Sequence, residues 1–252
     1  MTLPILYSGT KNASSWAMRA WLAFKEADVP FEERIVDIRR PQRFPNLGAI
    51  ARLSPSATVP LLVVDDQPIF DSIAIMEFAN EMCGGRLLPS DPVRRAKARS
   101  LVGWQHAGLS NICSRISFES AFYPYKRKLT DEEQGEAGGL FDHVEQLLRA
   151  SGGPFLFGDI SLADCMLAPA VVRLTRHHAD LSRHPASRAW TETLVARSTV
   201  AEVHAHAPRD GFVEHFLAAM REEALHRRNS RAGVLWRLGM ERSIRRFHSG
   251  SW

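Results

Sequence analysis

Apolar residues in the first third of the chain alternate between short extended runs and stretches with helical spacing. Short apolar runs at residues 3–7 and 31–38 predict two strands, and the segment between them repeats its apolar residues at a helical period. Ser14 and Ser15 stand at the start of that segment, where serine commonly caps the first turn of a helix. The chain is therefore predicted to begin as strand, helix, strand.

A β-hairpin follows this unit. A β-branched run at residues 61–64 ends at the turn-forming pair Asp65-Asp66 and returns as a short strand at residues 69–70. The segment 41–53, which leads from the second strand to the hairpin, is polar and is predicted to be a partly helical crossover. The hairpin adds two antiparallel strands to the predicted sheet.

Another helix follows the hairpin. Asp71 and Ser72 provide N-cap chemistry, and the residues after them keep up apolar density at helical spacing. The order strand, helix, strand, helix, hairpin, helix, with right-handed crossovers, predicts a four-stranded mixed sheet flanked by helices. Residues 1–85 are therefore predicted to form a thioredoxin-like α/β domain.

The strand pattern stops at a linker marked by glycine and proline, residues 86–94. Beyond it, helical periodicity predicts helices at residues 93–122, 131–150, 161–175, 185–196 and 211–225. These helices are predicted to form an all-α helical-bundle domain, residues 95–226, followed by a basic C-terminal tail, residues 227–252.

One of the predicted helices has a distinct start signal. Ser161 and Asp164 have the spacing of a capping box, with Asp in place of the usual Glu, and Ile160 can act as a hydrophobic staple. Pro169 lies inside the same helix and is expected to kink it, because proline removes a backbone donor. The motif has a structural meaning and no catalytic one.

Composition places the chain among ordinary globular proteins. Of its 252 residues, 45% are hydrophobic and 24% are charged, which excludes disordered, collagen-like and membrane classes. The formal net charge is +4, and arginines within residues 221–252 account for the excess, so we expect no nucleic-acid partner. No apolar stretch approaches the roughly 20 residues that span a bilayer, and no targeting segment is evident, so we expect a cytoplasmic protein.

Cysteines and histidines do not predict a metal site. The three cysteines lie far apart without a Cys-x-x-Cys motif, which indicates reduced thiols rather than a disulfide framework. The second half contains several histidines that are candidate metal ligands, namely His177, His178, His184, His204 and His206. They provide no i, i+4 pair with a third ligand, so we expect no bound metal.

Polar groups around the hairpin predict a binding site for a small peptide. If the Val59-Pro60 bond is cis, the backbone N–H and carbonyl of Val59 turn outward and can pair with an extended peptide as an added strand. The helix that Ser72 opens presents free N–H groups, a hydroxyl and the positive end of its dipole, which suit a carboxylate. Val-Pro, a hairpin, then an acidic residue and Ser at a helix start resemble the glutathione site of the glutathione transferase family.

Two further stretches carry the same resemblance. The sequence Gly-Asp-x-Ser-x-Ala-Asp that ends at Asp164 is similar to a cap on a buried helix of the family's helical domain. The sequence Ser-Ser-Trp-x-x-Arg that begins at Ser14, followed by Trp-Leu-Ala, resembles the serine-type branch of the family, near the zeta and tau classes. The resemblance covers residues 3–225 and implies a homodimer that uses glutathione as co-substrate.

The two serines exclude one kind of chemistry and allow another. Redox proteins of the thioredoxin-like class carry Cys at the start of the first helix, and neither Ser14 nor Ser15 can exchange disulfides. A serine hydroxyl can instead donate a hydrogen bond to the thiolate of glutathione and lower its pKa, which leaves the nucleophile charged at neutral pH. The resemblance implies that Ser14 has this role, and a shift by one residue assigns it to Ser15. In the alternative interpretation both serines only cap the helix.

The chain departs from the family just before the Val-Pro pair. Ala57 and Thr58 stand where the family usually has Gly and a long polar residue. Because Thr58 is short, we expect one contact with glutathione to be weak or to be supplied by Arg40 or Arg43.

The sequence therefore predicts a glutathione transferase that adds glutathione to a hydrophobic electrophilic small molecule or drives a glutathione-dependent isomerisation. The predicted catalytic residues are Ser14 and Ser15. The predicted glutathione-binding residues are Thr58, Val59, Pro60, Asp71 and Ser72. By resemblance, the electrophile pocket is expected among aromatic residues that core packing explains equally well, namely Trp104, Phe118, Phe122, Tyr123 and Tyr125.

A non-catalytic family member that serves as a scaffold is the alternative function. In it, the basic tail or the dimer surface would bind a protein partner. The tail interleaves apolar residues with arginines, which is compatible with an anionic membrane surface or an acidic partner, although such tails also dock on their own domain or fray.

Overall fold

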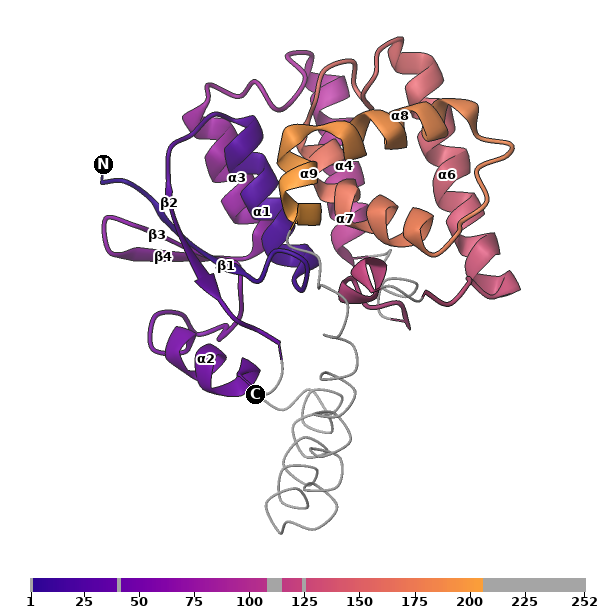
Figure 1. Ribbon diagram of the computed structural model, residues 1–252. Helices are drawn as coiled ribbons and strands as arrows, with labels where there is room; N and C mark the ends of the chain where they lie inside the picture. The colour runs from indigo at the N-terminus through magenta and orange to yellow at the C-terminus, as the bar shows by residue number, and fades with distance from the viewer. Residues whose placement is uncertain (1, 40–41, 108–114, 124–125, 206–252) are drawn as a thin grey trace, which may run out of the picture. The chain divides into compact units, whose positions relative to one another are not determined.

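The computed structural model describes residues 2–39, 42–107, 115–123 and 126–205, which belong to one compact unit, Met1–Pro208. A four-stranded sheet with the order β2-β1-β3-β4 forms its first half (Figure 1). The strands are β1 (Ile5–Gly9), β2 (Glu32–Val36), β3 (Leu61–Val64) and β4 (Gln67–Phe70). The helices of this half are α1 (Ser15–Glu26), α2 (Arg43–Ile50) and α3 (Ser72–Met82).

The sheet is mixed, as the sequence predicts. Strand β1 pairs in parallel with β2 and antiparallel with β3, and β3 pairs antiparallel with β4. The hairpin closes with Val64 opposite Gln67, and both turn residues, Asp65 and Asp66, have positive φ angles of 47° and 62°. Asp tolerates this left-handed conformation better than most residues, which explains its use in the turn.

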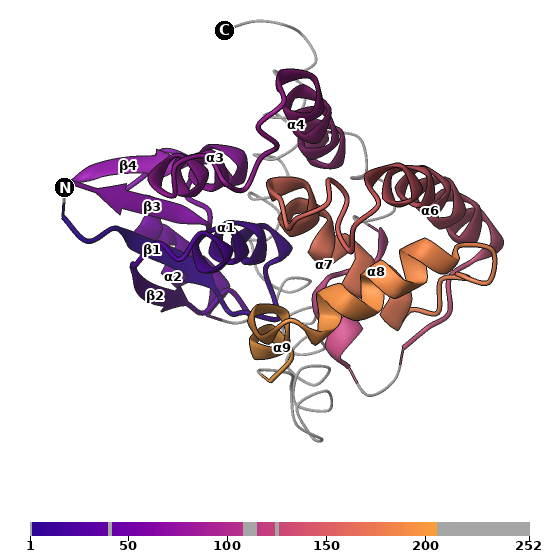
Figure 2. The ribbon, with the colours of Figure 1, turned by 90° about the horizontal axis from the view of Figure 1, so that it is seen from above.

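Two layers of helix cover the sheet (Figure 2). Helices α1 and α3 lie between the sheet and the second half of the unit, and they bury Phe24 and Ile75 against strand residues such as Leu62. Helix α2 lies on the opposite face, where Ile50 packs into a smaller apolar cluster with Val59. Burial on both faces of the sheet therefore fixes the ends of β1, α1 and α3, which carry the predicted site.

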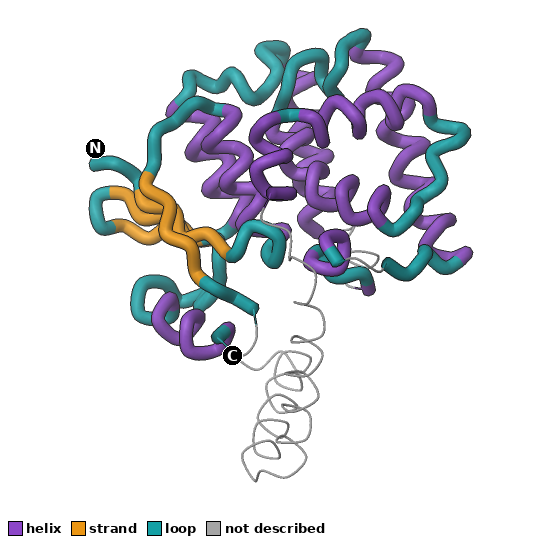
Figure 3. The backbone as a smooth tube through the Cα atoms, viewed as in Figure 1, coloured by secondary structure: helices purple, strands orange, loops and turns teal. Residues whose placement is uncertain are grey.

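In the second half of the unit, the described residues form helices joined by loops, with two isolated β-bridges in the loop before Leu162 (Figure 3). Its elements are α4 (Pro92–Ala107), the 3₁₀-helix η1 (Glu119–Phe122), α6 (Asp131–Ser151), α7 (Leu162–Arg176), α8 (Pro185–Ala196) and α9 (Ser198–Ala205). The predicted thioredoxin-like and all-helical architecture is thus confirmed, whereas the exact domain bounds stay predictions. The predicted helix at 211–225 and the basic tail lie outside the described residues.

One helical prediction was wrong, and one helix was not predicted. The single helix predicted over residues 93–122 is not continuous, because Ser117 is not helical and η1 has 3₁₀ geometry. Helix α9 was not predicted. Its start is held by Glu26 of α1, which pairs with Arg197 and accepts a hydrogen bond of 2.6 Å from Thr199 Oγ1.

Helix α7 occupies the centre of the helical half. The capping box predicted at its start is present, because Asp164 Oδ2 accepts from the Ser161 backbone N–H at 2.9 Å. The buried Asp164 carboxylate also accepts from Leu156 N at 3.1 Å and from Trp190 Nε1 at 2.9 Å. These bonds tie the loop before α7 and helix α8 to the first turn of α7. The helix continues through Pro169 to Arg176.

Helix α1 packs directly against α7 and α9 (Figure 2). The buried Arg19 of α1 donates from Nε to the Met166 carbonyl of α7 at 2.8 Å, and its guanidinium lies 4.3 Å from the centre of the Trp16 ring. This contact fixes the start of α1 against the helical half. Among the described residues, no helix is long and apolar enough to cross a membrane.

Glu133 is predicted to make stability depend on pH. Hydrogen bonds from Arg127 lower the pKa of Glu133 from 4.5 to about 2. A carboxyl whose pKa falls on folding stabilises the fold above pH 4.5, and this contribution is lost as the pH falls towards 2. Glu133→Gln should therefore lower the free energy of unfolding at neutral pH by about 1–2 kcal/mol, because Arg127 is half exposed and screened.

Urea unfolding from pH 7 to pH 2 measures this effect. The difference between wild type and Glu133→Gln should shrink as the pH falls below 4.5. The neighbouring Glu132, whose side chain is 76% exposed, provides the matched control, and Glu132→Gln should change stability little at any pH. A pH-independent difference for Glu133→Gln would contradict the assignment.

Candidate functional site

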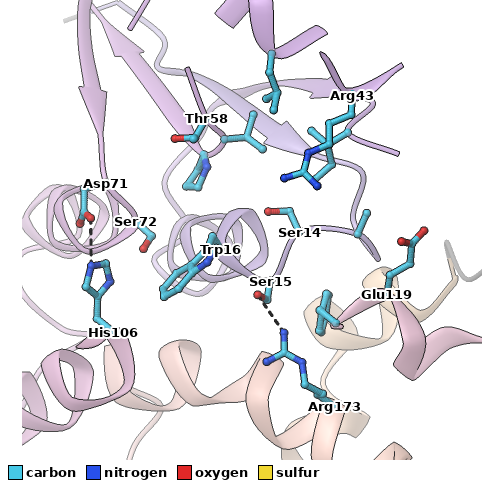
Figure 4. A pocket seen from close by; sticks show the side chains of 16 residues that line it. Ser14, Ser15, Trp16, Arg43, Thr58, Asp71, Ser72, His106, Glu119 and Arg173 are labelled. Carbon is cyan, nitrogen blue, oxygen red and sulfur yellow. Dashed lines mark hydrogen bonds and ion pairs between the residues drawn. The ribbon is translucent and has the colours of Figure 1, made fainter. Parts of the chain in front are cut away.

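A cavity of about 470 Å³ lies where the start of α1 meets the helical half. All seven residues predicted for the site line this cavity, namely Ser14, Ser15, Thr58, Val59, Pro60, Asp71 and Ser72. Figure 4 shows the side chains of Ser14 and Ser15 in the middle of the cavity, with Ser72 on one side. The structure thus brings these residues together, and their roles toward a ligand stay predictions.

Ser14 is the N-cap of α1. It is 7% exposed, and its Oγ accepts a hydrogen bond of 3.1 Å from the backbone N–H of Ala17. Within the described residues its hydroxyl donates to no protein group, so the hydroxyl hydrogen is free to point into the cavity. Gly9 makes room for this residue, because a Cβ added at Gly9 would lie 2.7 Å from the Ser14 Cβ.

Ser15 has a different environment. Its Oγ accepts a hydrogen bond of 3.4 Å from Arg173 Nη2, as Figure 4 shows. Arg173 comes from α7, is 3% exposed, and lines the cavity with its guanidinium near the Phe118 ring. Arg173 was not predicted to be a site residue. The signal was an arginine within the apolar run of residues 165–174, where a charge is expected only if it has a partner or a function.

The start of α3 forms the opposite end of the cavity. Asp71 caps this helix with a positive φ of 97°, and its Oδ1 accepts from the N–H groups of Ile73 at 2.8 Å and Ala74 at 3.4 Å. Ser72 is the first helical residue and is 4% exposed. The cavity therefore receives the positive end of the α3 dipole beside the Asp71 carboxylate.

The Val59-Pro60 bond is cis, as the sequence argument for strand addition requires. Within the described residues, the backbone N–H and carbonyl of Val59 make no hydrogen bond to the protein. The neighbouring Thr58 turns its hydroxyl toward its own loop and donates to Ser56 Oγ at 3.1 Å. Of the two arginines predicted to replace a long side chain here, Arg43 lines the cavity and Arg40 lies outside the described residues.

Three further aromatic or charged side chains of the cavity were not predicted as site residues. Trp16 and His106 lie at the α3 end, and their rings meet edge to face with centroids 5.2 Å apart. Glu119 of η1 lies at the other end, and burial raises the pKa of its carboxyl against the opposing hydrogen bond from Tyr123. Of the aromatic residues expected around an electrophile, Phe118 lines the cavity.

The described residues contain no group of three or more His, Cys, Asp or Glu side chains that could hold a metal ion. His177 instead serves the fold, with Nδ1 2.8 Å from the Arg127 carbonyl and Nε2 2.9 Å from Ser120 Oγ. Burial lowers the pKa of His177. His206, another candidate metal ligand, lies outside the described residues.

Comparison with known proteins assigns the chain to a family. Residues 13–82 match the N-terminal domain model of glutathione S-transferases, and residues 127–193 match the C-terminal domain model. A Caenorhabditis elegans protein named probable maleylacetoacetate isomerase is 30% identical, over 76% of this chain and 88% of that protein. The mouse maleylacetoacetate isomerase is 29% identical, over 77% of this chain and 88% of the relative.

Solved structures agree with this assignment at the level of the fold. A glutathione transferase homolog from Sulfitobacter, crystallised with bound glutathione, has a TM-score of 0.61 and 21% sequence identity, with 81% of this chain and 97% of that chain covered. The Populus trichocarpa glutathione transferase F2 has a TM-score of 0.63 at 20% identity, with 79% and 96% covered. From the two domain models and the curated relatives, we conclude that this chain belongs to the glutathione S-transferase family.

Proposed function

We propose that this chain is a glutathione-dependent isomerase or transferase whose electrophile carries a carboxylate. The observation that carries the proposal is the pairing of Ser14 and Arg173 in one cavity: a free hydroxyl at a helix start faces the same space as a nearly buried guanidinium. The hydroxyl suits a thiolate, and the guanidinium suits a carboxylate.

Glutathione is proposed to bind along the edge formed by the cis-Pro loop and the start of α3. The free backbone groups of Val59 suit the cysteinyl backbone of the peptide, as in strand addition. Ser72 and the α3 N-terminus suit the γ-glutamyl carboxylate, with Asp71 beside it for the α-ammonium group. Arg43 suits the glycyl carboxylate at the other end, in place of the short Thr58.

This placement brings the glutathione sulfur to the start of α1. There the Ser14 hydroxyl donates to the sulfur while its oxygen keeps the helix cap, so both functions of the hydroxyl are used at once. The positive end of the α1 dipole favours the same negative charge. Both effects lower the pKa of the bound thiol, and the thiolate is the nucleophile.

The names of the curated relatives suggest the electrophile, since they are maleylacetoacetate isomerases. A maleyl group contains a cis carbon–carbon double bond that is conjugated with carbonyl groups. The thiolate adds to one alkene carbon, the electron pair moves to the adjacent carbonyl oxygen, and the former double bond becomes single and rotates. Expulsion of the thiolate then restores the double bond in the trans form, so glutathione is regenerated and no proton or electron is consumed overall.

A cis-to-trans isomerisation assay tests this proposal. Purified protein with glutathione should convert maleylacetoacetate to its trans isomer, whereas the same protein without glutathione should not. Conjugation of glutathione to an uncharged chloronitrobenzene, measured in parallel, separates an isomerase from a general transferase. Glutathione binding without either activity would favour the scaffold function.

Ser72→Ala should weaken glutathione binding by about 5- to 10-fold, or about 1–1.4 kcal/mol. The expected loss is modest because the free N–H groups of the α3 start and the helix dipole still face the ligand carboxylate. Isothermal titration calorimetry measures the change. Unchanged affinity in Ser72→Ala would place the ligand carboxylate in another part of the cavity.

The homodimer and the cytoplasmic location expected from the sequence stay predictions.

A further inference from the structure

His106 joins the two halves of the unit at the α3 end of the cavity. It lies in the last turn of α4, and its Nε2 is 3.5 Å from Asp71 Oδ2, within the range of an ion pair (Figure 4). Its ring packs against Trp16, the second residue of α1, with centroids 5.2 Å apart. His106 therefore contacts the starts of both helices that are proposed to hold glutathione.

Oδ2 of the Asp71 carboxylate accepts no hydrogen bond from the described residues. A carboxylate offers about four lone-pair positions. On Oδ1, two are directed to the N–H groups of Ile73 and Ala74, at 2.8 and 3.4 Å. His106 Nε2 lies 3.5 Å from Oδ2, in a polar contact longer than an ordinary hydrogen bond, and Asp71 lines the cavity. Oδ2 therefore suits a cationic donor of the ligand, since a carboxylate attracts a cation.

The proton of His106 can be assigned to Nε2. Its Nδ1 is buried and has no hydrogen-bond partner among the described residues. A buried N–H without an acceptor costs free energy, so the tautomer with the hydrogen on Nε2 is favoured. The Nε2–H group of His106 then lies beside Asp71 Oδ2, in a polar contact of 3.5 Å.

We propose that His106 is a positioning residue for the γ-glutamyl end of glutathione: it holds the Asp71 carboxylate so that Oδ2 receives the α-ammonium group of the ligand. This inference rests on the proposed glutathione function. The α-ammonium group is separated from the α-carboxylate by a single carbon, so a carboxylate at Ser72 places the ammonium group at the preceding residue, Asp71. The helical half thus contributes to recognition of a peptide that the first half binds.

Two ligands and four variants test the proposal by calorimetry. The ligands are glutathione and its des-amino analogue, in which a glutaryl group replaces the γ-glutamyl residue. His106→Phe keeps a ring against Trp16 and removes the donor, and His106→Gln keeps a donor. Asp71→Asn, alone and combined with His106→Phe, shows whether the two residues act together.

His106→Phe should weaken glutathione binding by about 3- to 10-fold and change the affinity for the des-amino analogue by less than about 2-fold. His106→Gln should recover part of the loss, and His106→Phe should have no further effect in the Asp71→Asn background. Equal losses for both ligands, or no loss for either, would overturn the inference while the glutathione function stands. A wild-type protein that binds neither ligand would overturn the glutathione function as well.

Discussion

Arg173→Gln is expected to lower kcat/KM for a carboxylate-bearing electrophile by about 100-fold, or about 2–3 kcal/mol, with the Kd for glutathione nearly unchanged. Arg173 is nearly buried, so a substrate carboxylate beside it interacts with the guanidinium largely out of water. Gln fills a similar volume without the charge. Steady-state kinetics with the acidic electrophile, and calorimetry with glutathione, measure the two quantities separately.

Three controls distinguish recognition of a carboxylate from a structural role. The rate with an uncharged chloronitrobenzene should fall much less than the rate with the acidic substrate. Arg176→Gln, on the exposed side of the same helix, should leave both rates unchanged. Arg173→Lys keeps the charge but not the planar fork of donors, so its loss should be intermediate. Equal losses for charged and uncharged electrophiles would assign Arg173 to the fold.

The part of the cavity proposed to bind glutathione could be predicted from the sequence because it is built from local features. Asp71 and Ser72 cap a helix directly after a hairpin, and the Val59-Pro60 pair precedes the same hairpin. Caps and turns are specified by residues within a few positions of one another, so their geometry follows from short stretches of sequence. Ser14 and Ser15 were both predicted as caps of the first helix, and Ser14 is the N-cap of α1.

The position of Arg173 and His106 in the cavity could not be predicted, because packing of the two halves creates this part of it. Arg173 reaches the cavity only because α7 packs against α1, and its contact with Ser15 joins residues 158 positions apart. His106 reaches Asp71 in the same way. Nothing in the spacing of residues along the chain specifies which face of α4 or α7 meets the start of α1, because helical periodicity separates buried from exposed faces and identifies no partner.

The failed prediction of one helix over residues 93–122 has a related cause. Ile116, Phe118 and Ala121 are buried although the backbone around them is irregular and then 3₁₀. Phe118 and Ala121, three residues apart, have a spacing that an α-helix and a 3₁₀ turn share, so apolar periodicity alone does not separate the two, whereas Ile116, two residues before Phe118, does not fit one α-helical face. The interruption matters for function, since it places Phe118 and Glu119 in the cavity wall.

Ser14→Ala should raise the pKa of the bound glutathione thiol by about one to two, the equivalent of about 1.5–3 kcal/mol for a lost hydrogen bond to a charged acceptor. The rate of conjugation or isomerisation near neutral pH should fall by about 10- to 100-fold. The thiolate absorbance of the protein–glutathione complex, titrated with pH, measures the pKa directly. Binding should change far less, because the peptide contacts proposed for Val59 and Ser72 remain.

The capping role of Ser14 requires a second variant, because Ser14→Ala removes both the cap of α1 and the hydrogen-bond donor. Gly at an N-cap costs only a few tenths of a kcal/mol relative to Ser, so Ser14→Gly keeps most of the cap and still lacks the hydroxyl. If Ser14 activates the thiol, both variants should show the same raised pKa, although only Ser14→Ala loses about 1 kcal/mol of stability. If Ser14 is only a cap, Ser14→Gly should behave like wild type. Ser15→Ala should not change the pKa of the bound thiol, since Ser15 contacts Arg173. A raised thiol pKa in Ser15→Ala alone would assign activation of the thiol to Ser15.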